Sequence, residues 1–372
     1  MKRILIGYVI GSNSCGIDSY LFPLIRSLRE WGFQIDLLTN EKNENLCRFA
    51  EENACNLFVI PTLKHLGDRR RAIREILQAQ HYDMAYFNIS EAFNCVDVIE
   101  AKACGVKRIL VHSHASGPDE QSRVKWIFKY LVHVFAKHIL LKGKATDLLA
   151  CSGESAEWMF AKSERKLRNV TVISNAVDAK TYVYDATIRQ QMREQLGVEG
   201  RYVLGHVSGF TPVKNIGFLL EILNAAKKLQ ISQQTDRRPC LLLVGDGQEM
   251  SSVRAQVEEL HLQEDVIFTG RRTDVPALLQ AMDVFVFPSF REGLGFVAIE
   301  AQMSGLPVLA SDTIPREIQL SERCEFMSLK ETPDKWAQRL LEIEAPDRSA
   351  IDFEKSTFNL EVQQEQLKKI FL

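Results

Sequence analysis

Two series of short apolar runs, each run separated from the next by an amphipathic segment, follow one another along the chain. The first series is ILIGYVI, QIDLLT, NLFVIP, MAYFNI, RILVHSH, LLACS and VTVISNAV, and the second is YVLGHVSG, CLLLVGDG, VIFTG, VFVFPS, PVLAS and FMSL. Continuous apolar strands that alternate with helices are typical of a parallel sheet covered on both faces. Because the pattern restarts after the polar segment 178–200, it predicts an α/β fold with two doubly wound sheets rather than one large sheet.

The restart also predicts the domain boundaries. A chain of 372 residues is long enough for two domains. We expect an N-terminal Rossmann-like domain over residues 1–180 and a second one over residues 190–350. The C-terminal segment 355–372 has a helical period and is expected to pack back on the first domain. Ligands of such sheets bind beyond the carboxyl ends of the strands, so two facing sheets predict a binding cleft between the domains.

Composition excludes several other classes of function. The formal net charge of −2 leaves no overall basic field for nucleic acid. The eight cysteines form no C-x-x-C pair and no zinc spacing, a pattern that fits reduced thiols in a cytoplasmic protein. No apolar segment reaches the roughly 20 residues that a membrane span needs. The chain also lacks an Asp-x-Asp pair, which argues against a carboxylate-bound metal that clamps a diphosphate.

The stretch FPSFREGLGFVAIEAQMSG places two carboxylates, Glu292 and Glu300, around a glycine-rich loop. The loop follows a buried strand and leads into a helix, whose first N–H groups carry a partial positive charge. Gly293 and Gly295 would let a phosphate approach that helix end closely. Glu292 could then accept hydrogen bonds from sugar hydroxyls, and Glu300 could hold a ribose diol. The alternative is a capped helix with two solvated acids.

A second candidate lies in GHVSGFTPVKNIGFLLEIL, where Lys214 follows the end of a strand and precedes a helix that starts near Asn215. A lysine at the edge of a parallel sheet can reach a diphosphate as a point charge. The alternative is an ordinary surface lysine.

A third candidate lies in VHSHAS, where His112 and His114 stand at the end of a first-domain strand. Alternation along a strand points both rings to one side. We expect a hydrogen-bonding role rather than a metal site, because no third ligand is evident.

The segment RVKWIFKYLVHVFAKHILLKGKATDLL, residues 123–149, mixes lysines with aromatic and aliphatic side chains. Such a mixture suits a helix that lies on an anionic membrane surface. It equally suits one or two core-packing helices with a solvated lysine face, and both interpretations stay open. The arginine run at 69–71 is expected to be part of a helix surface.

These motifs together give the chain its resemblance to a known family. FPSFREGLGFVAIEAQMSGLPVLASDTIP is similar to the E-x7-E segment of the retaining nucleotide-sugar glycosyltransferases with the GT-B fold, family 4 of the sugar-enzyme classification. VISNAVD, TPVKN, LLLVGDG and VIFTGRRTDVPALLQAMDVFVFPS stand in the family's order. The HSHAS stretch most resembles members that build bacterial exopolysaccharide and capsule. The resemblance covers nearly the whole chain and implies an acceptor-side domain and a donor-binding domain that face each other across a cleft.

The resemblance implies a role for each matching residue. Glu292 would contact the donor sugar, Lys214 would neutralise the leaving phosphate and His114 would contact the transferring sugar, so these three are the catalytic candidates. The resemblance assigns the ribose to Glu300, and backbone approaches to phosphate to the glycines. The donor-binding candidates are Gly16, Gly209, Lys214, Arg271, Gly293, Leu294, Gly295 and Glu300. Such enzymes need no metal and no other cofactor.

The chain departs from the family pattern at one position. Members usually carry Arg where this chain has Gly209, five residues before Lys214. That Arg normally pairs with the lysine on the diphosphate, and losing such a donor costs about 10²–10³ in rate. Arg271 and Arg291 are the candidates for a substitute cation. Otherwise the enzyme is slow or inactive.

The resemblance therefore implies a retaining hexosyltransferase of exopolysaccharide or capsule biosynthesis. It would transfer a sugar from a UDP-sugar, or less favourably a GDP-sugar, to a lipid-linked oligosaccharide or a saccharide. Its expected location is the cytoplasm, with peripheral attachment to the inner face of the plasma membrane through residues 123–149. Two alternatives stay open: a nucleotide-sugar epimerase on the same fold, and a weak or catalytically silent partner of another glycosyltransferase, for which Gly209 is the support.

Overall fold

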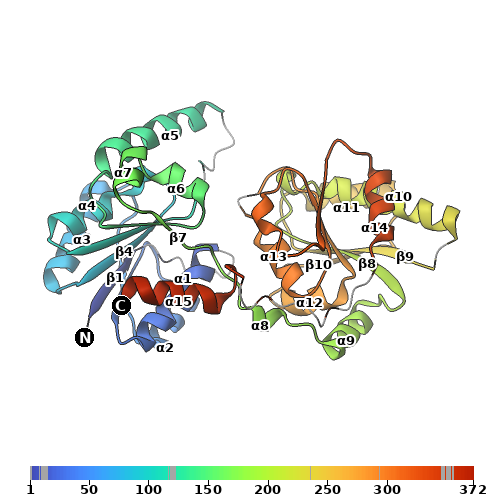
Figure 1. Ribbon diagram of the computed structural model, residues 1–372, viewed down its shortest axis with the longest axis horizontal. Coiled ribbons are helices and arrows are strands. Elements are labelled where there is room, and N and C mark those ends of the chain that lie inside the picture. The colour runs from blue at the N-terminus through green and yellow to red at the C-terminus, as the bar shows by residue number, and fades with distance from the viewer. Residues whose placement is uncertain are drawn as a thin grey trace. The chain divides into compact units, whose positions relative to one another are not determined.

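The structure is a computed structural model that consists of two compact α/β units (Figure 1). It describes residues 2–7, 9, 16–115, 117, 123–234, 236–292, 294–344, 348, 353 and 356–372, without the side chains of 16–19 and 123. The N-terminal unit comprises Met1–Ala176 and Glu361–Leu372, and the C-terminal unit comprises Val177–Leu360.

The N-terminal unit is built on a seven-stranded sheet with the order β3-β2-β1-β4-β5-β6-β7, in which all neighbouring strands are parallel. Its strands are β1 (Arg3–Gly7), β2 (Gln34–Thr39), β3 (Asn56–Val59), β4 (Met84–Ile89), β5 (Arg108–Ser113), β6 (Asp147–Ala150) and β7 (Thr171–Val172). Its helices are α1 (Gly16–Glu30), α2 (Glu44–Glu52), α3 (Leu66–Ala79), the 3₁₀ turn η1 (Ala92–Asn94), α4 (Val96–Ala103), α5 (Arg123–Phe135), the π-helical turn η2 (Ala136–Leu140), α6 (Gly153–Met159) and α7 (Lys162–Leu167).

The last helix of the chain, α15 (Leu360–Phe371), completes the N-terminal unit. Leu367 and Phe371 are fully buried in the same core cluster as residues of β1, β2 and α1. The Phe371 ring lies 5.7 Å from the ring of Tyr86 on β4. This packing explains why the red end of the ribbon returns to the blue start of the chain in Figure 1.

The C-terminal unit repeats the architecture with a six-stranded parallel sheet of order β10-β9-β8-β11-β12-β13. Its strands are β8 (Arg201–Val207), β9 (Arg238–Val244), β10 (Val266–Gly270), β11 (Val284–Phe287), β12 (Val308–Ser311) and β13 (Cys324–Met327). Its helices are α8 (Ala179–Tyr182), α9 (Ala186–Leu196), η3 (Pro212–Lys214), α10 (Ile216–Gln233), α11 (Met250–Glu259), α12 (Val275–Ala281), α13 (Phe296–Met303), η4 (Arg316–Ile318) and α14 (Pro333–Glu342).

The predicted α/β fold with two Rossmann-like, doubly wound parallel sheets is confirmed. Each predicted apolar run contains a strand, because a strand buried on both faces needs apolar residues at successive positions. VTVISNAV yields only the two-residue edge strand β7. The polar segment 178–200 contains two helices that the apolar periodicity did not indicate. Asp185 caps the longer of them, α9, and Gly197 ends it with a positive φ of 65°.

No helix among the described residues is both long enough and apolar enough to cross a membrane.

Candidate functional site

The central feature of the C-terminal unit is the pairing of β8 with β11, two strands that are not consecutive in the sequence. The sheet changes direction here, since β9 lies on one side of β8 and β12 lies beyond β11. Loops that leave neighbouring parallel strands at such a point diverge and leave room for a ligand. The loop after β8 carries Lys214, and the loop after β11 carries Glu292.

Hydrogen bonds connect these two loops directly. The Phe290 N–H donates to the Val213 carbonyl at 2.8 Å. The Asn215 side-chain amide donates to the Pro288 carbonyl at 3.1 Å. Asn215 has a positive φ of 56°, which Asn tolerates better than most residues, and it stands immediately before α10. The two bonds hold Lys214 opposite Glu292.

Lys214 and Glu292 form a two-pronged ion pair. The Lys214 Nζ lies 2.7 Å from one carboxylate oxygen of Glu292 and 2.8 Å from the other. The lysine side chain is 21% exposed and the glutamate side chain 10%, so the pair is only partly open to solvent. The same Nζ lies 5.9 Å from the centre of the Phe287 ring, within the range of a cation–π contact. The two charges are fixed while the ammonium keeps access to a ligand.

Gly295 brings helix α13 to this ion pair. It is the N-cap of α13, with a positive φ of 88°. A Cβ atom there would lie 2.8 Å from the Phe287 ring, so glycine is required both by conformation and by space. Among the described residues, no side chain caps α13. The backbone N–H groups of its first turn therefore supply partial positive charge beside Lys214.

Glu300 lies on α13 and contacts a residue from a distant segment. Its carboxylate is partly buried and hydrogen-bonds to the Tyr182 hydroxyl at the end of α8. Desolvation raises the pKa of Glu300, and the hydrogen bond from Tyr182 acts in the opposite direction. Tyr182 also packs against the hydrophobic core. The acid is thus held in one orientation.

The loop after β8 packs tightly on the loop after β9. A Cβ atom on Gly245 would lie 1.8 Å from the Ser208 carbonyl oxygen, and one on Gly247 would lie 2.4 Å from the Phe210 carbonyl oxygen. The predicted tight turn VGDG therefore exists because the two backbones touch. Gly209, between these contacts, is exposed, and a Cβ atom there would meet nothing within 4 Å.

His206 holds the loop after β8 through hydrogen bonds at both ring nitrogens. Its Nδ1 lies 2.9 Å from the Val286 carbonyl and its Nε2 lies 2.8 Å from the Ser208 hydroxyl. Burial, with a smaller contribution from Lys214, lowers the pKa of His206 to about 4. The ring is therefore neutral at pH 7, donates from Nδ1 to the carbonyl and accepts the serine hydroxyl at Nε2.

The remaining donor-site candidates of the C-terminal unit lie as follows. Arg271 is exposed directly after β10, and Arg291 is exposed next to Glu292. Leu294 packs against the core. Gly293 lies outside the described residues. Neither arginine is in the Lys214–Glu292 ion pair, and the structure brings together Lys214, Glu292 and Gly295.

In the N-terminal unit, His114 lies beyond the end of β5 and bonds to Asn88 on β4. Its Nε2 lies 2.9 Å from the Asn88 Oδ1, and the Asn88 amide donates to the Gly7 carbonyl at 3.3 Å. The Asn88 amide orientation makes the histidine Nε2 the donor. Its buried Nδ1 then has no partner within the described part of the chain. Burial lowers the pKa of His114 to about 4, so Nδ1 is an acceptor that could receive a ligand hydroxyl.

His112 and His114 point to the same side, as predicted, with ring centres 4.1 Å apart. The Tyr86 hydroxyl lies 2.6 Å from the His112 Nδ1, so His112 belongs to a buried network under His114. Gly16 is the first residue of α1. Nothing in the described ranges forms a group of three or more His, Cys, Asp or Glu that could hold a metal ion.

A cavity of about 130 Å³ opens at the carboxyl ends of β1 and β4. Its lining includes Gly7, Asn88, Ser90, Glu91, Asn94 and the buried pair Arg69–Asp97. The Arg69 Nε lies 2.7 Å from the Asp97 Oδ1, which neutralises both charges. The expectation of a helix surface for the arginine run is therefore wrong for Arg69, which is 2% exposed. The cavity walls offer amide, hydroxyl and carboxylate groups.

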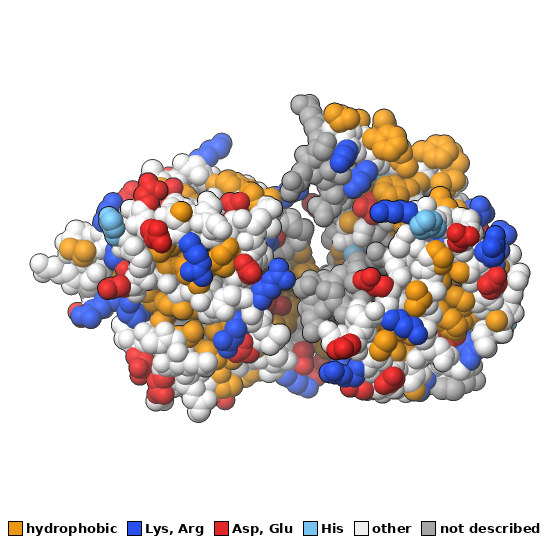
Figure 2. All heavy atoms as spheres, turned by 180° about the vertical axis from the view of Figure 1, so that it is seen from behind, with side chains coloured by type: hydrophobic (Ala, Val, Ile, Leu, Met, Phe, Trp, Pro, Cys, Tyr) orange, Lys and Arg blue, Asp and Glu red, His pale blue; other side chains and the backbone are white. Residues whose placement is uncertain are grey.

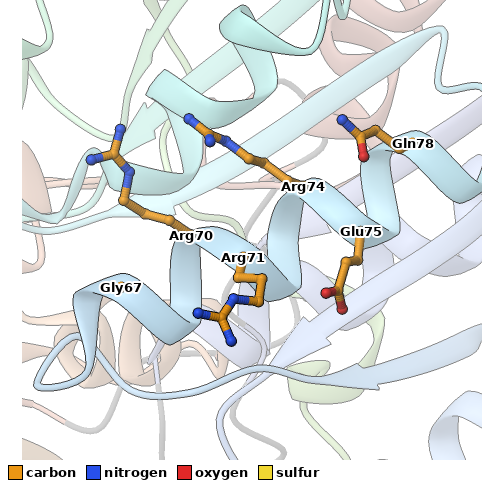
Figure 3. A pocket seen from close by; sticks show the side chains of 6 residues that line it. All are labelled: Gly67, Arg70, Arg71, Arg74, Glu75 and Gln78. Carbon is orange, nitrogen blue, oxygen red and sulfur yellow. The ribbon is translucent and has the colours of Figure 1, made fainter.

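A second hollow lies on α3, where Gly67, Arg70, Arg71 and Arg74 line it (Figure 3). Glu100 of α4 contacts both Arg70 and Arg74. The guanidinium groups of Arg70 and Arg74 are therefore already paired with a carboxylate.

Comparison with known proteins identifies the C-terminal unit. Residues 201–345 match the family described as Glycosyl transferases group 1. The C-terminal unit is a glycosyl transferases group 1 domain. This group 1 domain contains all of the Lys214–Glu292 site.

Relatives of the chain carry glycosyltransferase names. EpsF of Bacillus subtilis (strain 168), named as a glycosyltransferase, is 28% identical over 96% of this chain and 91% of its own. An Escherichia coli protein named UDP-Gal:alpha-D-GlcNAc-diphosphoundecaprenol alpha-1,3-galactosyltransferase is 27% identical over 78% of each chain. A Staphylococcus aureus protein, named capsular polysaccharide biosynthesis glycosyltransferase CapM, is 26% identical over 50% of this chain and 48% of its own.

Solved structures give the same fold. Anabaena Alr3699/HepE, solved in complex with UDP, has a TM-score of 0.78 and 21% identity over 100% of this chain and 99% of its own. WaaG, a glycosyltransferase involved in lipopolysaccharide biosynthesis, has a TM-score of 0.64 and 15% identity over 99% of both chains. The predicted resemblance to GT-B glycosyltransferases is confirmed.

Sequence reasoning missed three supporting residues, two in the C-terminal unit and one in the N-terminal unit. Tyr182 lies in a four-residue helix without a periodic pattern, so nothing in the sequence indicates its contact with Glu300. Asn88 looked like one polar residue at the end of an apolar strand. His206 could have been noticed, because a histidine inside the strand YVLGHV must satisfy both ring nitrogens when it is buried.

Proposed function

We propose that the chain is a retaining glycosyltransferase that moves a hexose from a nucleotide-diphosphate sugar, with a UDP-sugar favoured, to a saccharide acceptor carried on a lipid. The observation that carries this proposal is the Lys214–Glu292 ion pair at the β8–β11 edge, next to the uncapped start of α13. A diphosphate needs positive charge, and a sugar needs fixed acceptors of hydrogen bonds. The site offers both within one loop pair.

Each residue has a chemical role in this proposal. Lys214 and the first N–H groups of α13 neutralise the diphosphate as it leaves. Glu292, which Lys214 holds in place, accepts hydrogen bonds from hydroxyls of the donor sugar. Glu300 binds the ribose diol from the Tyr182 side of α13. His114 accepts a hydroxyl of the transferring sugar at its Nδ1. The lysine and the helix supply the charge that a metal ion would otherwise bring, so we propose that no metal is needed.

The names of similar proteins support the choice of substrates. The donor proposal follows the Escherichia coli relative, whose name includes UDP-Gal, and the HepE structures, solved with UDP and with UDP-glucose. The lipid-linked acceptor follows the diphosphoundecaprenol in the same relative's name. A role in exopolysaccharide or capsule biosynthesis follows the CapM relative. A GDP-sugar remains the second donor to test.

The test is acceptor-dependent release of nucleotide. The purified chain is incubated with UDP-glucose, UDP-galactose or GDP-mannose, with and without a diphospholipid-linked sugar, in the presence of EDTA. We expect UDP release only when both substrates are present, and a product whose anomeric proton coupling by NMR matches that of the donor. An inverted product would refute retention, and loss of activity in EDTA would refute metal independence. A changed donor sugar without UDP release would identify an epimerase.

One observation favours a second function. Gly209 has no side chain at the position where members of the family that the chain resembles carry a cation. A Cβ atom there would meet nothing within 4 Å. The chain would then bind nucleotide weakly and serve as a partner of an active glycosyltransferase. Transfer by the purified chain alone, with a product stoichiometric to released UDP, would exclude this second function.

A further inference from the structure

Helix α5 and its continuation η2 expose large apolar side chains to solvent, whereas the polar His133 is buried. Large apolar side chains are exposed to solvent along them: Val124, Ile127, Phe128, Leu131, Phe135 and Ile139. Phe128 is 68% exposed, Leu131 61% and Phe135 57%. They recur every three or four positions, so they form one stripe along the helix. In Figure 2 this stripe is the group of orange side chains at the upper right.

The side of α5 and η2 that meets the protein is held by polar groups as well. His133, only 1% exposed, accepts the Ala92 N–H at Nδ1 over 3.1 Å and donates from Nε2 to the Trp158 carbonyl over 2.9 Å. Its ring stacks on the Trp158 ring with centres 3.6 Å apart. Lys137 donates to the Glu157 carbonyl. A helix that buries a histidine and leaves its large apolar side chains in solvent offers those side chains to an apolar partner.

The charges beside the stripe indicate which partner this is. From Arg123 to Lys144 the sequence contains lysines and histidines but no acidic residue. Lys125 and Lys142 are exposed at the two ends of the stripe. Trp126 and Tyr130 stack with ring centres 5.3 Å apart and are partly exposed along its edge. Apolar residues along the centre, amphipathic aromatics at the edge and basic groups around them match the layers of an anionic lipid surface.

His133 and Trp158 also connect the stripe to the cavity of the N-terminal unit. The Trp158 indole N–H donates to the Ser90 carbonyl at 2.8 Å, and His133 holds the next N–H but one, that of Ala92. Ser90, Glu91 and Asn94 line the cavity of about 130 Å³. The rim of this cavity is thus bonded on one side to the element that carries the stripe. A sugar attached to a lipid headgroup would reach such a cavity from the membrane surface.

We propose that the α5–η2 stripe lies in the interfacial layer of an anionic bilayer. The stacked His133 and Trp158 rings, with their hydrogen bonds to Ala92 and Ser90, are called the clasp; the clasp holds the cavity rim beside that layer to receive a lipid-borne saccharide. The membrane part is independent of catalysis. The saccharide part rests on the proposed glycosyltransferase function.

Vesicle flotation tests the membrane part without any substrate. The variants are Phe128→Ser with Leu131→Ser, and, as the matched control, Ile231→Ser on α10, whose side chain is 70% exposed in the other unit. With vesicles of phosphatidylcholine and phosphatidylglycerol, we expect wild type and control to float and the double variant to lose at least about tenfold in bound fraction. Because the replaced side chains lie in solvent, thermal unfolding and UDP binding should not change.

Three results would overturn this part. The first is equal flotation of the double variant and wild type. The second is equal binding of wild type to vesicles of phosphatidylcholine alone and to anionic vesicles, with no effect of Lys125→Gln and Lys142→Gln. The third is a wild-type dimer in light scattering that the double variant converts to monomer without any vesicle binding, since the stripe would then cover a second copy of the chain.

The clasp is tested with Trp158→Phe, which keeps the ring stack and removes the N–H bond to Ser90. We expect a KM for the lipid-linked acceptor that rises about tenfold, while the KM for the UDP-sugar and vesicle flotation stay the same. Equal changes in both KM values, or none, would overturn the role of the clasp. If wild type shows no transfer but still floats, the proposed function fails and the membrane proposal stands.

Discussion

The Nζ of Lys214 contacts both carboxylate oxygens of Glu292, at 2.7 and 2.8 Å, across 78 residues of sequence. The contact exists because β8 and β11 are neighbours in the sheet although two strands separate them in the chain. Through this contact, the Lys214 and Glu292 side chains hold each other in place. A ligand that takes the lysine charge therefore also defines where Glu292 points.

Replacing Gly295 by Ala should damage both stability and nucleotide binding. The added Cβ would lie 2.8 Å from the Phe287 ring at a positive φ of 88°. Strain of this kind costs about 1–3 kcal/mol. We expect that loss in the free energy of unfolding, measured by urea denaturation, together with weaker UDP binding. Gly209→Ala is the control and should change neither, because its Cβ meets nothing within 4 Å. Equal stability of the two variants would show that the α13 entry is not strained.

Replacing Gly209 by Arg should raise turnover. The position is exposed and a Cβ atom there meets nothing within 4 Å, so a side chain can leave the backbone without a clash at its first atom. A cation that stabilises charge on the leaving diphosphate is worth up to about 10²–10³ in rate. Steady-state kinetics should show a higher kcat for Gly209→Arg and no gain for Gly209→Met, which has bulk but no charge. Unchanged or lower kcat in Gly209→Arg would contradict the idea that the glycine limits catalysis.

Replacing Glu300 by Gln should have opposite effects on stability and on binding. Burial raises the pKa of Glu300 in the folded protein above its ordinary 4.5, so the ionised form destabilises the fold at pH 7. The variant should therefore be more stable than wild type at pH 7, and the difference should vanish as the pH falls through the raised pKa to 4.5. UDP should bind the variant more weakly. A stability difference that does not depend on pH would refute the assignment.

Stability should fall in mild acid because of the buried histidines. Burial lowers the pKa of His114, His133 and His206 to about 4 and holds that of His112 well below its ordinary value, which is 6.5 for all four. The unfolded chain takes up these protons first, so the stabilisation is complete above pH 6.5 and is lost as the pH falls toward 4. Each histidine contributes up to about 1.4 kcal/mol per pH unit.

Urea denaturation at pH 7.5, 6.0 and 5.0 gives the free energy of unfolding at each pH. Its slope against pH gives the number of protons taken up on unfolding. His206→Gln should take up fewer protons than wild type. A free energy of unfolding that stays constant over this range would show that these rings bind protons in the fold as readily as in the unfolded chain.

The positions of the main strands along the chain were predictable, since strands buried on both faces leave continuous apolar runs in the sequence. The positions of Lys214, Glu292 and Gly295 at strand ends followed from the same pattern. Their mutual contact did not, because sequence order says nothing of which strands are neighbours when the sheet reverses direction. Tyr182 was not predictable, since a four-residue helix has no period to detect.

The α5 segment shows a different limit. Its period of three to four residues is the same whether the apolar side faces the core or the solvent. The sequence therefore left both interpretations open. The structure decides the orientation through His133, the polar residue that α5 buries against Ala92 and Trp158.

The most direct test of the central claim is the affinity of the Lys214→Met variant for UDP and for uridine, measured by isothermal titration calorimetry. Lys228→Met, an exposed lysine on α10, controls for the loss of one charge. If Lys214 binds the diphosphate, the dissociation constant for UDP should rise about 10–100-fold in Lys214→Met, while uridine binding and the control stay unchanged. Unchanged UDP affinity, or an equal loss for UDP and uridine, would contradict the account.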